Sequence, residues 1–149
     1  MEQTLNVFIE GIVRYFQHTS HKEVDIGSPY LIDSQPGVIN DYTAVITISG
    51  AYQGCCYFTA PSILLKHLIL STGESDTSEE MIIDATGEVA NTLTGNAREK
   101  LGSDFIISVP KVVKGAPSEH AFPYQQRAYA IPMSWKSYKA LLGICLVAN

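Results

Sequence analysis

Three segments of the chain place hydrophobic residues at the spacing of an α-helix. Residues 5–16 carry apolar side chains with a period near 3.6, which predicts an amphipathic helix. Residues 61–70 predict a second helix, with a proline in its first turn. Residues 79–101 predict a third and longest helix, which Thr77-x-x-Glu80 would begin as a capping box and Gly102 would end.

The remaining segments have the composition of β-strands. Residues 24–32 predict an extended segment, and residues 42–49 and 54–59 predict a hairpin, because β-branched and aromatic residues stand on both sides of Gly50. Further strands are predicted at 105–113, about 126–133 and 140–147, with a turn-rich connection at 115–120. The helices do not alternate one-for-one with strands, so we expect an α+β fold with a largely antiparallel sheet. The length of 149 residues predicts a single domain, residues 1–149.

One face of the third predicted helix differs from the rest. At about 100° of turn per residue, four residues fall within an arc of roughly 60°. These four form the motif face: Asp84, Glu88, Asn91 and Gly95. The opposite side carries Ile82, Val89, Leu93 and Lys100, flanked by Ala85, Thr86, Ala90 and Ala97. The apolar side is long enough to pack on a core, which would leave the motif face exposed.

Gly95 needs an explanation, because glycine inside a helix costs about 1 kcal/mol relative to alanine. One hypothesis is that the backbone of a partner passes close to the motif face at this position. The competing hypothesis is that Gly95, like Gly87, packs against another part of its own fold. The sequence leaves both open.

The pattern Asp84-x-x-x-Glu88-x-x-Asn91 resembles the signature of the CheC/CheX/FliY chemotaxis phosphatases. Three further segments resemble parts of the same family: Thr47–Gly54, Ile107–Gly115 and Ile131-Pro-Met-Ser134. The resemblance covers nearly the whole chain. A single copy of the motif and the short length resemble the CheX branch more than the two-site CheC branch. The fold that this resemblance implies is a CheC/CheX-like domain with one long motif-bearing helix.

The resemblance also implies a substrate, the phosphorylated receiver domain of a response regulator such as CheY. Asn91 would orient the attacking water, and Glu88 would pair with the active-site lysine of the receiver. Mg²⁺ would be supplied by the receiver, so no metal or cofactor of its own is expected in this chain. Asp84, at the first position of the motif, would support the site or contact the partner rather than take part in the chemistry. Gly95 is a candidate partner contact on the separate ground of its bare backbone on the same face. CheX proteins form homodimers, and the apolar strands around Ile131 and Leu146 could offer edges for pairing.

A second reading of the motif face belongs to a different functional class, a non-catalytic module that binds receivers or dimerises. The intact pair of Glu88 and Asn91 favours the phosphatase, because a pure binder has no need of the carboxamide. The chain also shows a weak internal repeat, in which the first helix leads to Asp25–Pro29 as the third leads to Ile107–Pro110. In the first copy Glu10 stands where Glu88 does, and Val13 replaces Asn91.

Composition narrows the classes of partner and location that are expected for this protein. The net charge is −5 and no cluster of Lys and Arg is present, so nucleic acid is not expected as a partner. The longest apolar run, 140–148, has nine residues and is too short to cross a bilayer. The start of the chain lacks the positive segment of a signal peptide, and a cytoplasmic location is expected.

The remaining residues with reactive or aromatic side chains favour structural roles. Adjacent Cys55 and Cys56 are expected to face opposite sides of a strand, the alternative being a strained disulfide or redox sensor. Trp135 and Tyr138 fit either a partner contact or the core. The four histidines are His18, His21, His67 and His120, and no third ligand with metal-site spacing joins His18 and His21.

Overall fold

The structure is a computed structural model that describes residues 2–32, 39–115 and 128–148. Its helices are α1 (Glu2–Ser20), α2 (Ser62–Ser71) and α3 (Glu79–Leu101). Its strands are β1 (Asp25–Ile26), β2 (Tyr30–Ile32), β3 (Tyr42–Gly50), β4 (Tyr52–Ala60), β5 (Phe105–Ile107), β6 (Lys111–Lys114), β7 (Ala128–Trp135) and β8 (Tyr138–Ala148). The predicted connection at 115–120 lies outside the described residues beyond Gly115, and His120 also lies outside them.

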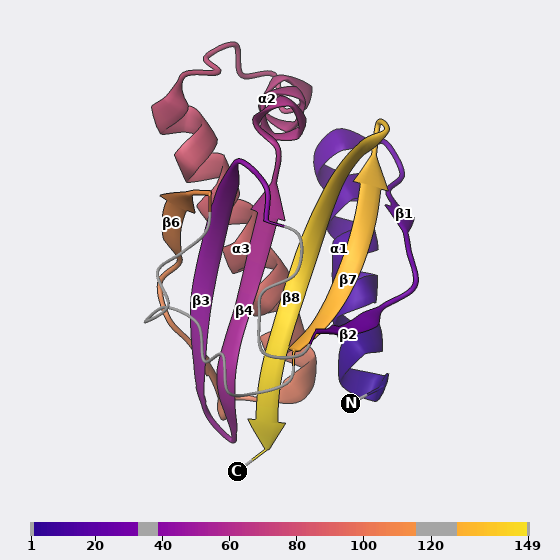
Figure 1. Ribbon diagram of the computed structural model, residues 1–149, viewed down its shortest axis with the longest axis vertical. Helices are drawn as coiled ribbons and strands as arrows, with labels where there is room; N and C mark the ends of the chain where they lie inside the picture. The colour runs from indigo at the N-terminus through magenta and orange to yellow at the C-terminus, as the bar shows by residue number, and fades with distance from the viewer. Residues whose placement is uncertain (1, 33–38, 116–127, 149) are drawn as a thin grey trace.

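The described strands form one sheet in the order β1-β7-β8-β4-β3-β5, in which β2 also pairs with β7 and β6 with β3. Every pairing among them is antiparallel. Helices α1 and α3 run along the same face of this sheet, with α2 near one end (Figure 1). The predicted α+β fold with a largely antiparallel sheet is confirmed.

The topology supports the internal repeat. Each half has a helix, two short strands and a hairpin, and the two hairpins meet where β4 pairs with β8. The short strands of each half pair with the hairpin of the other half: β1 and β2 with β7, and β5 and β6 with β3. Glu10 and Val13, which the repeat places at the positions of Glu88 and Asn91, are both exposed on α1. The two helices are therefore topological counterparts.

The strand predicted at 105–113 is wrong in one respect, because it is two strands, β5 and β6. Ile107 pairs with Ile48 and Lys111 pairs with Val45, so three residues stand opposite only two on β3. The extra residue makes this a β-bulge, and Pro110 has no N–H to continue the ladder. The bulge is held by Ser108, whose N–H donates to the carbonyl of Thr47 while its Oγ accepts from the Thr47 N–H.

The predicted bounds of α3 are confirmed, but the extent of α1 and the cap of α3 differ from prediction. Helix α1 extends beyond residues 5–16 at both ends, since its terminal turns are polar or exposed and give no periodic apolar signal. The capping box at Thr77 is wrong: the residue before α3 is Ser78, and no side chain caps the helix. Glu79 instead anchors the first turn, through an ion pair with Lys114 and a hydrogen bond of 3.1 Å from Tyr42 Oη.

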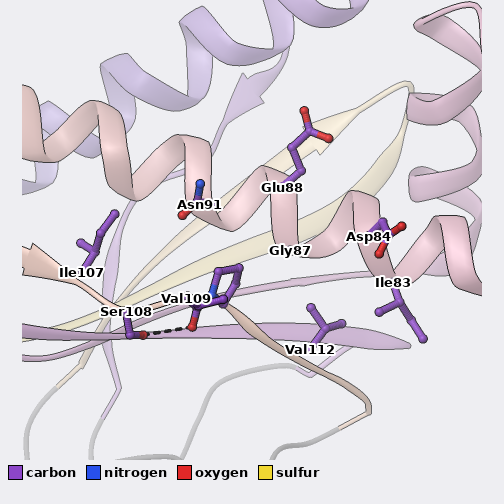
Figure 2. A pocket seen from close by; sticks show the side chains of 10 residues that line it. Ile83, Asp84, Gly87, Glu88, Asn91, Ile107, Ser108, Val109 and Val112 are labelled. Atoms are coloured by element: carbon purple, nitrogen blue, oxygen red, sulfur yellow. Dashed lines mark hydrogen bonds between the residues drawn. The ribbon is translucent and has the colours of Figure 1, made fainter.

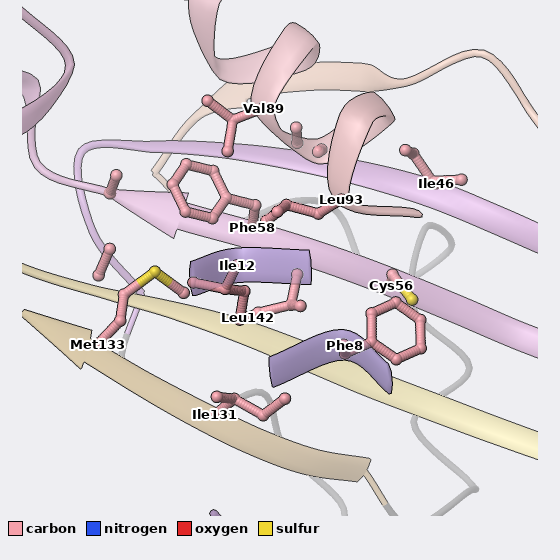
Figure 3. Close-up of a cluster of buried hydrophobic side chains, with 14 of the residues drawn as sticks. Phe8, Ile12, Ile46, Cys56, Phe58, Val89, Leu93, Ile131, Met133 and Leu142 are labelled. Atoms are coloured by element: carbon pink, nitrogen blue, oxygen red, sulfur yellow. The ribbon is translucent and has the colours of Figure 1, made fainter. Parts of the chain in front are cut away.

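The main core lies between the sheet and the helices. Figure 3 shows Phe8 and Ile12 of α1 and Val89 and Leu93 of α3 packed over Phe58 of the sheet. Trp135 is also part of this core, with no exposed surface, and its Nε1 donates to Ser20 Oγ at 3.1 Å. Of the two roles considered for Trp135, the structure therefore supports core packing.

The expected roles of two strand segments have different outcomes. Cys56 belongs to the helix-side core, whereas Cys55 lies opposite Cys145 on the other face of the sheet, so the prediction of opposite faces is confirmed. The suggestion that the strand around Ile131 offers a free edge is wrong, because β7 pairs with β8 on one side and with β1 and β2 on the other. At Leu146, β8 pairs with β4. Strands β7 and β8 are interior strands and both side chains are buried. Among the described strands, the edges of the sheet are formed by the short strands, and homodimer formation stays a prediction.

Burial predicts slow thiol chemistry in the folded protein. Burial raises the pKa of Cys55 to about 12, and it raises the pKa of Cys56 and of Cys145 as well. The reactive thiolates are therefore scarce near pH 8. We expect almost no reaction with an aromatic disulfide reagent in the native state, and reaction of all three thiols after denaturation. Rapid modification of a thiol in native buffer would contradict this packing.

Candidate active site

Helix α3 presents the motif face to solvent because its other side is buried. The buried residues of the helix are Ile82, Thr86, Gly87, Val89, Ala90, Leu93, Thr94 and Ala97. The hydroxyls of Thr86 and Thr94 donate to the carbonyls four residues earlier at 2.6 Å, so they are satisfied inside the core. Asp84, Glu88 and Asn91 are exposed and Gly95 is half-buried.

One residue placed on the buried side by periodicity is not buried. Lys100 is exposed in the last turn of α3, and its Nζ lies 3.4 Å from Glu10 Oε2 of α1. A long charged side chain can reach solvent from the edge of a packed face, which explains the difference. The ion pair is exposed and contributes little to stability.

The motif face borders a groove of about 770 Å³ between α3 and the β5–β6 bulge. We call this the main groove, and its lining residues are Ile83, Asp84, Gly87, Glu88, Asn91, Ile107, Ser108, Val109, Pro110 and Val112. Figure 2 shows the helix residues on one side and the bulge residues on the other. Ser108 Oγ donates to the carbonyl of Val109 at 3.1 Å. The groove therefore joins three of the four predicted site residues to a loop far from them in sequence.

Gly87 determines how closely the bulge approaches the helix. A Cβ at this position would lie 3.3 Å from Cγ2 of Val112 and 3.5 Å from Cγ of Pro110. The missing side chain thus lets β6 and the proline pack against the helix backbone. Of the two glycines considered for packing, Gly87 is a packing glycine. Gly95 is not, since a Cβ there would meet nothing within 4 Å.

The polar side chains of the motif face form no bonds that stabilise the described part of the chain. No hydrogen bond or ion pair is found there for the side chains of Asp84, Glu88 or Asn91. Other polar residues of α3, such as Glu79 and Lys100, are paired. An exposed carboxylate and carboxamide one turn apart are therefore available to a partner.

The side of α3 that faces α1 adds a residue that the sequence pattern does not indicate. A smaller hollow of about 230 Å³ is lined by Tyr15 and Thr19 of α1 and by Asp84 and Glu88 among others. Burial, and secondly the negative charge of Glu88, raise the pKa of Tyr15 to about 12. The Tyr15 hydroxyl therefore keeps its proton at neutral pH near the Glu88 carboxylate. Glu88 lies between the two hollows and lines both.

Sequence reasoning also missed the residues of the bulge as part of the site. Val109 has 85% of its surface exposed, the largest exposure among the described large hydrophobic residues. An apolar side chain that exposed beside a polar pair suits a protein partner. The signal available in the sequence was Val109 between a serine and a proline, where a strand cannot continue. That Val109 lies across the main groove from Asn91 cannot be read from the sequence, because only the folded chain brings the two residues together.

The described residues contain no other arrangement of comparable chemistry. Within residues 2–32, 39–115 and 128–148, no three His, Cys, Asp or Glu side chains are grouped to hold a metal ion. None of the described helices is long and apolar enough to span a membrane.

The sequence and the fold match a known family of signalling proteins. The sequence profile of the family described as "Chemotaxis phosphatase CheX" matches residues 42–134, a range that includes all of α3 and the bulge. The chain belongs to the CheX family. No curated protein sequence matches the chain.

Solved structures confirm the predicted CheC/CheX-like fold. The chemotaxis protein CheX of Vibrio vulnificus is 23% identical, with a TM-score of 0.82 and coverage of 97% of this chain and 99% of that one. A CheC-like superfamily protein of a Shewanella species is 24% identical, with the same TM-score and 97% of each chain covered. CheX of Borrelia burgdorferi, solved in complex with CheY, BeF3 and Mg²⁺, is 17% identical, with a TM-score of 0.77 and coverage of 95% and 96%.

The two glycines of α3 offer a test of the site geometry. Gly95→Ala should raise stability by up to about 1 kcal/mol, because alanine is the better helix former and the position is open. Gly87→Ala should gain less or destabilise, because its Cβ is crowded by Val112 and Pro110. Thermal melts of both variants check this. A lower melting temperature for Gly95→Ala would show that Gly95 packs within its own fold.

Proposed function

We propose that this protein is a phosphatase that hydrolyses the aspartyl phosphate of a CheY-like receiver domain. The observation that carries the proposal is the pair Glu88 and Asn91. Both are exposed, and neither is paired within the described residues, on the open face of a helix whose other side is buried. Membership of a family described as chemotaxis phosphatases supports it. So does the Borrelia relative, which was solved bound to CheY.

Asn91 would act by positioning. A carboxamide is neither a useful acid nor a base, but it can accept one hydrogen bond and donate another, which suits it to holding a water molecule. An aspartyl phosphate is a mixed anhydride and already labile, and phosphoryl transfer depends mainly on position and charge. The oriented water would attack phosphorus in line. The bond from phosphorus to the aspartate oxygen breaks, giving inorganic phosphate and a free carboxylate.

Glu88 would act by binding. Its carboxylate stands one turn from Asn91 and is exposed, so it can pair with the active-site lysine of the receiver. Asp84, one turn further along the helix, would add to the negative potential facing that lysine. The receiver would bring its own Mg²⁺. In this proposal, α3 supplies the orienting amide and a charge, and the receiver supplies the metal and the phosphoryl group.

The main groove would receive the part of the receiver that surrounds the phosphorylated aspartate. The groove is wide and open on the solvent side of α3, and it has a polar wall on the helix and an apolar wall on the bulge. Val109 would supply apolar contact, while Ser108 is held by its own hydrogen bonds. The partner would thus touch two elements that the fold holds rigidly together.

Asn91→Ala should reduce dephosphorylation to the intrinsic rate of the receiver while leaving binding largely intact, because only the positioning of water is lost. The measurement is the decay of a phosphorylated receiver, with binding measured separately on a receiver activated by beryllofluoride. Lys100→Ala, on the other side of the same helix, is the control and should keep full activity. An Asn91→Ala protein that works at the wild-type rate would remove Asn91 from the mechanism.

The same experiment separates the phosphatase from a binding module. If the wild-type protein binds the activated receiver but leaves the decay rate unchanged, the motif face serves binding only.

Glu88→Ala should weaken binding by about 2–5 kcal/mol, the usual cost of removing one member of a desolvated charge pair. Titration against the beryllofluoride-activated receiver measures this change. Glu10→Ala is a matched control, because Glu10 is an exposed glutamate at the repeat-related position of α1. Unchanged affinity of the Glu88 variant would mean that Glu88 makes no such pair.

A further inference from the structure

The open surface along α3 continues beyond Asn91. A second cavity of about 430 Å³, the distal hollow, is lined by Gly95, Arg98, Glu99, Gly102, Ser103 and Ile107. Ile107 also lines the main groove, so the two depressions adjoin along the same side of the helix. A partner seated in the main groove is therefore adjacent to the distal hollow.

Arg98 continues the line of the motif face. It follows Asn91 by seven residues, which is about two turns, so the two side chains leave the helix within roughly 20° of each other. The separation along the axis is about 10 Å, at 1.5 Å per residue. Between them lies Gly95, where an added Cβ would meet no atom within 4 Å. A partner can therefore reach Arg98 without crossing another side chain of this line.

The charge of Arg98 is available. Arg98 is exposed, and neither of the ion pairs found among the described residues includes it. The neighbouring Glu99 also lines the hollow, but adjacent residues on a helix do not face each other. The exposed line on α3 thus runs from two carboxylates, Asp84 and Glu88, through a carboxamide and a glycine to a single cation.

We propose that the distal hollow receives an acidic side chain of the same receiver, which pairs with Arg98 and fixes the direction in which the receiver lies along α3. This inference rests on the proposed function. In-line attack requires one orientation, and the contacts in the main groove lie close together, so a more distant contact holds the direction of the receiver more firmly. A second contact of opposite charge at Arg98, about 15 Å from Glu88 along the helix axis, disfavours the reversed orientation, because like charges would then meet at both ends.

This proposal specifies which charged groups the receiver must carry. It is a receiver with a basic group beside its phosphorylated aspartate and an Asp or Glu about 10 Å away, in the direction that faces the end of α3. Pairs at the rim of an interface act mainly on the association rate and on its dependence on salt. Arg98 should therefore select among receivers and speed docking, without changing the rate of the chemical step once the complex is saturated.

The test compares Arg98→Glu with Lys100→Glu, two charge reversals on the same helix that change the net charge equally. Binding to a beryllofluoride-activated receiver is measured at low and at high salt. Arg98→Glu should lose about tenfold or more in affinity at low salt, mostly in the association rate, and the loss should shrink at high salt. Lys100→Glu, which faces α1, should stay within about twofold of wild type. Arg98→Gln should lose less than Arg98→Glu, in the same direction.

The outcomes are distinguishable. Restoration of Arg98→Glu binding by reversing one acidic residue of the receiver to lysine would establish the pair. If the wild type binds and dephosphorylates the receiver while Arg98→Glu and Lys100→Glu behave alike, the proposed function stands and this inference fails. If the wild type binds no activated receiver, both fail. Equal thermal melts of the variants show that the differences arise at the surface.

Discussion

The burial of one side of α3 is the constraint on which the rest of the structure depends. Val89 and Leu93 pack into the core shared with α1 and the sheet, and each fully buried aliphatic side chain contributes about 1.5–3 kcal/mol. The helix therefore cannot rotate without exposing them. Gly87 adds a second contact, because its bare backbone lets Pro110 and Val112 approach. These contacts leave Glu88 and Asn91 at the surface beside the bulge.

If the proposed function holds, this arrangement explains how a helix face can position Glu88 and Asn91 without supporting contacts of their own. Glu88 and Asn91 have no hydrogen-bonding partner among the described residues, so their placement comes from the backbone of a rigid helix. In the proposed mechanism the amide only orients water and needs no tuned pKa, and the aspartyl phosphate is already activated. The proposed reaction needs only a positioned water and a nearby charge, which is consistent with an open groove rather than an enclosed pocket.

Local patterns in the sequence predicted much of the fold. Helical periodicity and Gly102 predicted α3 and its end, and the exposed position of Asp84, Glu88 and Asn91 followed from the same geometry. The split of residues 105–113 was missed because a bulge depends on the register with β3, which is not local. The main groove was missed for the same reason, since it exists only where the bulge folds back against Gly87.

The most direct test of the account is a crystal structure of this protein with a beryllofluoride-activated receiver and Mg²⁺. The account predicts that the receiver lies in the main groove, with the Asn91 carboxamide beside the beryllofluoride and in line with its bond to the aspartate. Glu88 should lie against the lysine of the receiver. A receiver bound to another surface, such as the face of the sheet opposite the helices, would contradict the central claim that α3 carries the site.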